Sequence, residues 1–153
     1  MKKLLIVIPL FSLAAIVNAQ SISVQNALSC NVHIKIYAHD ATACGGIVCN
    51  TTVAAATTTA FLSMLDLNST SCSGTGPGWI EVSGGAAHCV LSLSSADLDG
   101  VFVTVIGGGS FPILGHSTCY STLTASSTDC SSTAIYADWD YAGYPDIKVH
   151  IHY

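Results

Sequence analysis

The chain is unusually poor in charge. Charged side chains make up 8% of its 153 residues, whereas they are about 25% of an ordinary globular protein. Arginine is absent, and lysine occurs only at Lys2, Lys3, Lys35 and Lys148. Proteins that bind nucleic acids neutralise phosphates with Lys and Arg side chains. We therefore expect no nucleic acid among the partners of this protein.

Catalytic and metal-binding motifs are absent as well. The sequence contains no Gly-x-Ser-x-Gly, the motif that marks many serine hydrolases, and no Cys-x-x-Cys pair of the kind that marks zinc sites. Residues 95–100 begin like a calcium loop, but Ile106 stands where the loop needs a bidentate Glu. The sequence therefore predicts a protein that is not an enzyme and has no cofactor, because no motif supports Ca²⁺ or Zn²⁺.

The first 19 residues have the layout of a secretory signal peptide. Lys2 and Lys3 precede an apolar run from Leu4 to Val17, and Ala19 ends a plausible cleavage site. The run is about 14 residues long, shorter than the roughly 20 that span a bilayer. We expect residues 1–19 to be removed and residues 20–153 to form one secreted domain, extracellular or periplasmic, with no membrane span.

The remaining 134 residues have two Lys and nine acidic residues, a formal charge of −7. Ser and Thr account for 32 of them, so the polar surface is built from hydroxyl groups. Apolar residues are still frequent enough to bury a core.

A two-residue hydrophobic period dominates this domain. In residues 31–38 and 147–153, apolar side chains alternate with Lys, His and Tyr, which is typical of half-buried strands. Glycine-rich turns separate other short runs, and Asp99-Gly100 has the chemistry of a hairpin turn. The pattern predicts an all-β fold, an antiparallel β-sandwich of immunoglobulin-like or jelly-roll-like type. Further strands are expected over residues 22–27, 51–55, 57–63, 79–83, 87–93, 101–106, 111–114, 120–125 and 133–137.

Seven cysteines in a small exported domain indicate disulfides that staple the fold. They are Cys30, Cys44, Cys49, Cys72, Cys89, Cys119 and Cys130. Cys44 with Cys49, and Cys119 with Cys130, are two pairings that would close short loops, but the sequence leaves the connectivity open. An odd count predicts one free thiol or a link to a second chain.

The segment from residue 135 to 146 concentrates aromatic and acidic side chains. In a loop, such rings stack on the apolar faces of sugars, while carboxylates accept hydrogen bonds from sugar hydroxyls. The ordinary alternative is a loop that covers the end of the sandwich. The candidate ligand-binding residues are Tyr136, Asp138, Trp139, Asp140, Tyr141 and Tyr144.

Histidines supply a second candidate site. His150 and His152 lie two residues apart on one strand, so both point to the same face. If the last strand lay beside the strand that starts at residue 31, His33 would complete a metal site. The ordinary alternative is a solvated polar face.

Together these patterns predict a small secreted or cell-surface protein without catalytic activity. The first hypothesis is a binding module that uses the aromatic and acidic loop to contact carbohydrate or another surface protein. The alternative is a structural extracellular protein that associates with itself as a homo-oligomer, through the odd cysteine or through an open strand edge.

Overall fold

The computed structural model describes residues 20–39, 46–62, 67, 81–82, 97–117, 119–140 and 146–153. The backbone alone is described at residues 46–48 and 81–82. The expected signal peptide therefore lies outside the described residues, as does the strand expected at 87–93. Among the residues that the structure describes, no helix is long and apolar enough to cross a membrane.

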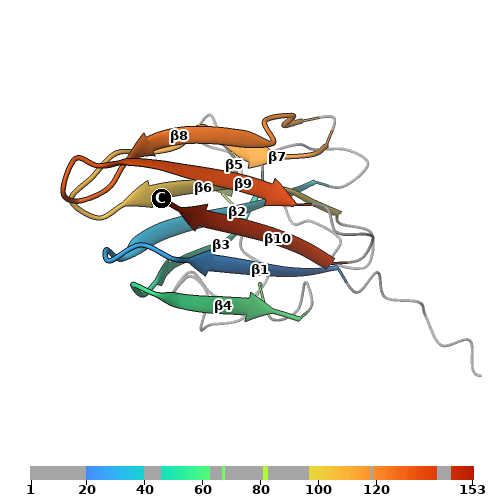
Figure 1. Ribbon diagram of the computed structural model, residues 1–153. Coiled ribbons are helices and arrows are strands. Elements are labelled where there is room, and N and C mark those ends of the chain that lie inside the picture. The colour runs from blue at the N-terminus through green and yellow to red at the C-terminus, as the bar shows by residue number, and fades with distance from the viewer. Residues whose placement is uncertain are drawn as a thin grey trace, which may run out of the picture.

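The described chain is nearly all β, as predicted, and its strands form two five-stranded sheets (Figure 1). Sheet A has the order β4-β1-β10-β9-β8, and sheet B has the order β5-β3-β2-β6-β7. The strands are β1 (Ser21–Asn26), β2 (Val32–His39), β3 (Gly46–Val53), β4 (Thr57–Phe61), β5 (Glu81–Val82), β6 (Asp97–Val105), β7 (Leu114–Gly115), β8 (Thr124–Thr128), β9 (Ala134–Asp140) and β10 (Asp146–His152).

The two sheets share one hydrophobic core. Alternate residues of the central strands are buried, as the two-residue period predicts, so each sheet turns one apolar face inward. Sheet A contributes Val24, Val149 and Ile151, which belong to the same buried cluster as Ile34 and Val103 of sheet B. The other face of each central strand carries polar side chains, and these are the surfaces available for function.

One pairing departs from the antiparallel arrangement that the sequence pattern predicts. Strand β1 runs parallel to β10, in register from Ser21 opposite Asp146 to Asn26 opposite Ile151. Tight hairpins impose antiparallel pairing only on strands that are adjacent in sequence. Because β1 and β10 come from opposite ends of the domain, no short connection fixes their relative direction.

The hairpin turn predicted at Asp99-Gly100 is also wrong. Both residues lie inside β6, which pairs with β2 on one side and with β7 on the other. Gly100 stands opposite Gly115 of β7, and a Cβ atom at Gly100 would lie 2.5 Å from the carbonyl oxygen of Leu114. Glycine is needed here because two backbones approach closely, which a turn-based interpretation of the dipeptide does not reveal.

The turn between β1 and β2 is organised by a buried amide. The Asn26 side chain donates hydrogen bonds to the carbonyl oxygens of Cys30 (2.8 Å) and Ala54 (3.0 Å), and accepts one from the backbone N–H of Leu28 (3.1 Å). A buried polar side chain is stable only when its hydrogen bonds are made. Asn26 therefore ties the end of β1 to the segment that follows β3, which links the two sheets.

A disulfide between Cys30 and Cys130 joins this turn to the turn between β8 and β9. The pairing of Cys119 with Cys130, considered from the sequence, is thus wrong, because the fold places these two turns side by side. Cys49 and Cys119 each take part in a disulfide as well, whereas Cys44, Cys72 and Cys89 lie outside the described residues. The Asp129 carboxylate accepts hydrogen bonds from the backbone N–H groups of Thr133 and Ser131, which lower the pKa of Asp129 and fix the turn.

The Cys30–Cys130 disulfide closes a loop with a sequence separation of 100 residues. In the chain-entropy treatment, a loop of about this length stabilises the folded state by about 4 to 5 kcal/mol. We expect the double substitution Cys30→Ala, Cys130→Ala to lower the free energy of unfolding by about that amount, measured by urea denaturation. A loss below about 1 kcal/mol would contradict this account of the disulfide.

Candidate functional site

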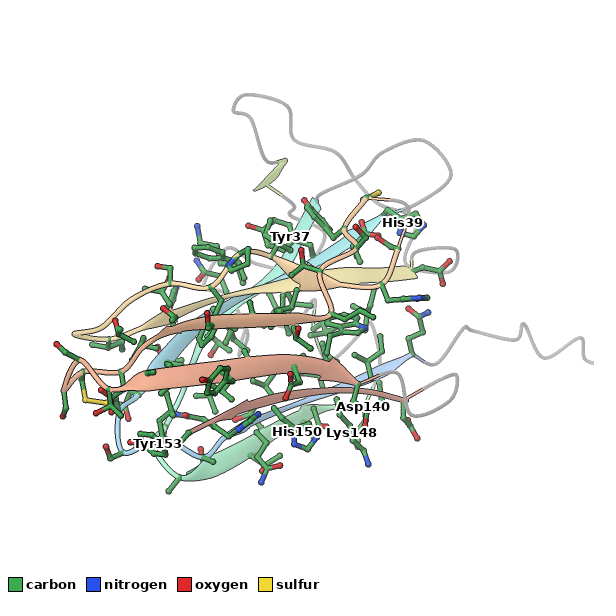
Figure 2. All side chains as sticks on the ribbon, turned by 45° about the horizontal axis from the view of Figure 1, so that its top comes forward. Tyr37, His39, Asp140, Lys148, His150 and Tyr153 are labelled. Atoms are coloured by element: carbon green, nitrogen blue, oxygen red, sulfur yellow. A yellow bond between two sulfur atoms is a disulfide. The ribbon has the colours of Figure 1, made fainter. Side chains whose placement is uncertain are left out.

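The solvent-facing side of strands β9 and β10 gathers most of the residues that the sequence singles out. We call this surface the outer face; it consists of Tyr136, Asp138, Asp140, Lys148, His150 and His152. Antiparallel pairing sets His152 opposite Tyr136, His150 opposite Asp138 and Lys148 opposite Asp140. Figure 2 shows Asp140, Lys148 and His150 together on this side of the molecule. Two candidate sites that are separate in the sequence therefore form one surface.

The best-defined interaction on the outer face involves His152. Its Nε2 lies 2.8 Å from Oδ2 of Asp138, and its Nδ1 lies 3.0 Å from the backbone carbonyl oxygen of Tyr153. Both partners are acceptors, so both ring nitrogens must donate, and this requires the protonated imidazolium form. The hydrogen bond to Asp138 is the main cause that raises the pKa of His152, followed by the bond to Tyr153.

Tyr136 lies next to this pair. Its side chain is 49% exposed, and its ring centroid lies 6.1 Å from that of His152, with the two planes tilted by 32°. On its other side, Tyr136 borders a shallow, open depression of about 280 Å³ whose remaining wall comes from Thr124, Ala125 and Ser126 of β8. An exposed ring beside hydroxyl groups offers both a stacking surface and hydrogen-bond partners to a ligand.

The structure corrects part of the predicted aromatic loop. Residues 136–140 form strand β9 rather than a loop, and the Trp139 side chain points into the core with 5% exposure. The alternation of β9 explains this, because Ile135, Ala137 and Trp139 share the buried face. Trp139 therefore has no ring face available for stacking on a sugar. Tyr141 and Tyr144 lie outside the described residues.

The predicted metal triad is not assembled. His33 lies on β2 in sheet B, whereas His150 and His152 lie on β10 in sheet A, whose neighbours are β1 and β9. The assumption that the strands carrying these histidines are adjacent is therefore wrong. Moreover, both nitrogens of His152 face acceptors, which leaves no lone pair for a metal while these contacts persist.

A second cluster lies on the other sheet, at the end of β2. Asp99 of β6 is completely buried, and its Oδ1 lies 2.6 Å from Nδ1 of His39, whose side chain is 25% exposed. Although the two atoms are close, they do not meet the geometry of a hydrogen bond, and Oδ2 of Asp99 has no hydrogen-bond partner among the residues that the structure describes. Figure 2 shows His39 and Tyr37 on the side of the molecule away from Asp140, Lys148 and His150.

Tyr120 lies near this cluster and packs against Tyr37. The rings of Tyr37 and Tyr120 are 5.6 Å apart, and burial together with the nearby Asp99 carboxylate raises the pKa of Tyr120. A bulge in β6 shifts the register of β2 against β6, because Tyr37 pairs with Gly100 and Ala38 pairs with Leu98, which leaves Asp99 as the extra residue. Beside this bulge the alternation of β2 also ends, since Ile36, Tyr37 and Ala38 are all buried.

Sequence reasoning missed this cluster, yet a signal for it exists. Asp99 has the same parity as Val101, Val103 and Val105, which form the buried face of β6. Extending that alternation toward the amino terminus would have predicted a buried carboxylate. The pattern was hidden because Asp99-Gly100 resembles a turn.

No protein-family model matches this sequence, and comparisons with curated proteins and with solved structures found no significant match. The candidate sites therefore rest on the geometry of this chain alone.

The His152–Asp138 pair predicts a pH dependence of stability. The pKa of His152 is raised in the folded protein above its ordinary value of 6.5. The stabilising contribution is therefore fully present below pH 6.5 and is lost as the pH rises through the folded-state pKa. Because the pair is solvent-exposed, the loss should not exceed about 1 kcal/mol.

The variant Asp138→Asn should reduce this dependence, because it removes the main cause of the raised pKa of His152. Its free energy of unfolding should therefore fall less than that of the wild type between pH 6 and pH 9. Asp140→Asn, on the same face but opposite Lys148, serves as the control and should keep the wild-type dependence. The measurement is urea denaturation of both variants across this pH range. If both variants showed the same pH dependence of the free energy of unfolding, the dependence would not come from the His152–Asp138 pair.

Proposed function

We propose that this protein is a small exported binding module without catalytic activity, and that its outer face binds a neutral glycan. The observation that carries the proposal is the exposed ring of Tyr136, set between the His152–Asp138 pair and the hydroxyl-lined depression along β8. This surface replaces the predicted loop as the binding site, because Trp139 belongs to the core.

The charge of the outer face favours a neutral ligand. Lys148 and the imidazolium of His152 balance the carboxylates of Asp138 and Asp140, so the surface carries no dominant sign. Neighbouring strands add hydroxyl and amide groups: Thr124 lies opposite Asp138, and Gln25 lies opposite His150. A sugar needs many hydrogen-bond partners and an apolar ring to stack against, and this face supplies both.

Rigidity is a further argument for this face. Its side chains project from β9 and β10, which each pair with a strand on both sides. Binding sites on paired strands hold their geometry better than sites on loops. Two sheets that share one core are the architecture of a β-sandwich, and we propose that type for the whole fold, as the sequence pattern predicts. The Cys30–Cys130 disulfide is consistent with secretion into an oxidising compartment.

Replacement of Tyr136 tests the proposal. An aromatic contact contributes about 0.5 to 1.5 kcal/mol beyond its buried area, so Tyr136→Ala should weaken glycan binding by about tenfold. The measurement is titration calorimetry with soluble neutral glucans, mannans and chitin oligomers. Ile106→Ala is a matched control, because Ile106 is similarly exposed (51%) but follows β6 of sheet B.

Binding that Ile106→Ala preserves and Tyr136→Ala weakens would support the outer face as the glycan site. Equal affinities for wild type and Tyr136→Ala would place the ligand elsewhere. If the wild type binds none of these polysaccharides, the glycan proposal fails.

A second candidate function is self-association through sheet A. Its edge strands β4 and β8 have five residues each and no charged or proline residue, whereas the edge strands of sheet B have two residues each. Natural proteins block exposed edges with lysine, proline or short strands. The Thr128 carbonyl of β8 already accepts a hydrogen bond from the Gly109 N–H (2.9 Å), so among the described strands β4 is the more open edge.

A single lysine on this edge discriminates between the two functions. If copies of the chain pair through β4, the wild type should show a mass that rises with concentration in light scattering, and Thr58→Lys should remain a monomer. Ser126→Lys places the same charge on β8 and should associate like the wild type. A wild-type protein that stays monomeric at millimolar concentration would exclude this alternative.

A further inference from the structure

The cluster at the end of β2 contains a carboxylate that the fold leaves poorly satisfied. Asp99 is completely buried and approaches only one basic group among the described residues, His39. Within the described part of the chain, its Oδ2 has no hydrogen-bond partner. Burial of a carboxylate is costly unless the group is paired and hydrogen-bonded or coordinates a metal. This arrangement therefore calls for a further partner of positive charge.

A third ligand atom lies close to the pair. One ligand atom from each of His39, Asp99 and Cys119 lies within 4.8 Å of the other two, and for Cys119 this atom is Sγ. Imidazole nitrogen, carboxylate oxygen and thiolate sulfur are all common zinc ligands. Cys119, however, is disulfide-bonded, so its sulfur has no negative charge to offer. In this oxidised state the cluster has only two ligands.

Backbone hydrogen bonds fix the turn that carries Cys119. Backbone N–H groups of Cys119 and Tyr120 both donate to Ser117 Oγ at 3.1 Å, and the Ser117 N–H donates to the Tyr120 carbonyl oxygen at 2.7 Å. Tyr120 then packs against the close contact between β6 and β7, because a Cβ atom at Gly115 would lie 3.0 Å from its Cβ. The turn that carries Cys119 is therefore held by hydrogen bonds and packing as well as by the disulfide.

We propose that His39, Asp99 and Cys119 form a zinc site that the disulfide blocks and reduction opens. A dithiol reductant attacks the disulfide of Cys119 through one thiolate, and its second thiol resolves the mixed disulfide. Two electrons and two protons pass to the protein, so Cys119 and its former partner become thiols while the reductant becomes a disulfide. Cys119 then releases its proton to solvent, and Zn²⁺ binds Sγ.

Only a small rearrangement is needed for coordination. Zinc bonds of about 2.0 to 2.2 Å to nitrogen and oxygen at tetrahedral angles place these atoms about 3.3 Å apart. The Nδ1 of His39 and the Oδ1 of Asp99 would therefore have to separate from their present 2.6 Å. Because the His39 side chain is partly exposed, solvent reaches the site and a water molecule can fill the fourth position.

The test uses Co²⁺ as a spectroscopic substitute for Zn²⁺. The full secreted chain is reduced with dithiothreitol, desalted under argon and titrated with Co²⁺, while untreated protein is titrated in parallel. Because every cysteine is reduced, two variants that each lack one thiol are compared. Cys119→Ser removes the proposed ligand, whereas Cys130→Ser removes a thiol from the distant β8–β9 turn. Asp99→Asn tests the carboxylate, and His33→Asn controls for loss of a histidine on β2.

We expect reduced wild type, Cys130→Ser and His33→Asn to bind one Co²⁺ with a thiolate-to-metal absorption band. Cys119→Ser and Asp99→Asn should bind at least tenfold more weakly, and untreated protein should show no such band. Absence of binding to the reduced wild type, or equal affinities of Cys119→Ser and Cys130→Ser, would overturn the proposal.

If reduction unfolds the chain, circular dichroism provides the test instead. Metal sites that exist only in the folded state couple binding to folding. If reduction abolishes the β signal, added Zn²⁺ should restore it in the wild type but not in Asp99→Asn. Failure of Zn²⁺ to restore the wild-type signal would also overturn the proposal.

Discussion

The parallel pairing of β1 with β10 is the constraint on which the rest of the structure depends. Without it, sheet A would divide into a β4–β1 pair and a separate β10–β9–β8 meander. Six registered residue pairs join the two ends of the domain, and the Ser21 hydroxyl donates a hydrogen bond to the Asp146 carboxylate where the pairing starts. Because this pairing makes β10 a central strand, its outward residues lie on a rigid surface.

Because the chain has few charged residues, the contacts between ionisable groups that the fold creates are its most distinctive chemical features. Both candidate sites are built around a contact between a histidine and an aspartate, but in opposite environments. His152 and Asp138 are exposed, and water screens their interaction. Asp99 is fully buried beside His39, where an unpaired charge would be costly. The exposed pair suits reversible contact with a polar ligand, whereas the buried pair suits a cation held close to it.

Much of the outer face could be predicted from the sequence. The two-residue period correctly placed His150 and His152 on the outward side of their strand. The same alternation separates Tyr136, Asp138 and Asp140 from the buried side of β9, although the sequence analysis assigned these residues to a loop. What it could not supply was the pairing of β9 with β10, which merges two predicted sites into one. The loop assignment of residues 136–140 failed for another reason: a cluster of aromatic and acidic residues was given more weight than the alternation, which continues through Trp139.

By itself the sequence determined the all-β class, the approximate position of most described strands and which side chains of β10 face the core. The alternation of side chains is a property of each strand's own backbone, so it can be predicted without knowing which strands are adjacent. Only the tertiary structure decided which strands are adjacent, and hence that Cys30 pairs with Cys130 and that His33 and His150 lie in different sheets. It also decided that Asp99 meets His39 across a bulge. Such contacts join segments distant in the chain, and no local pattern encodes them.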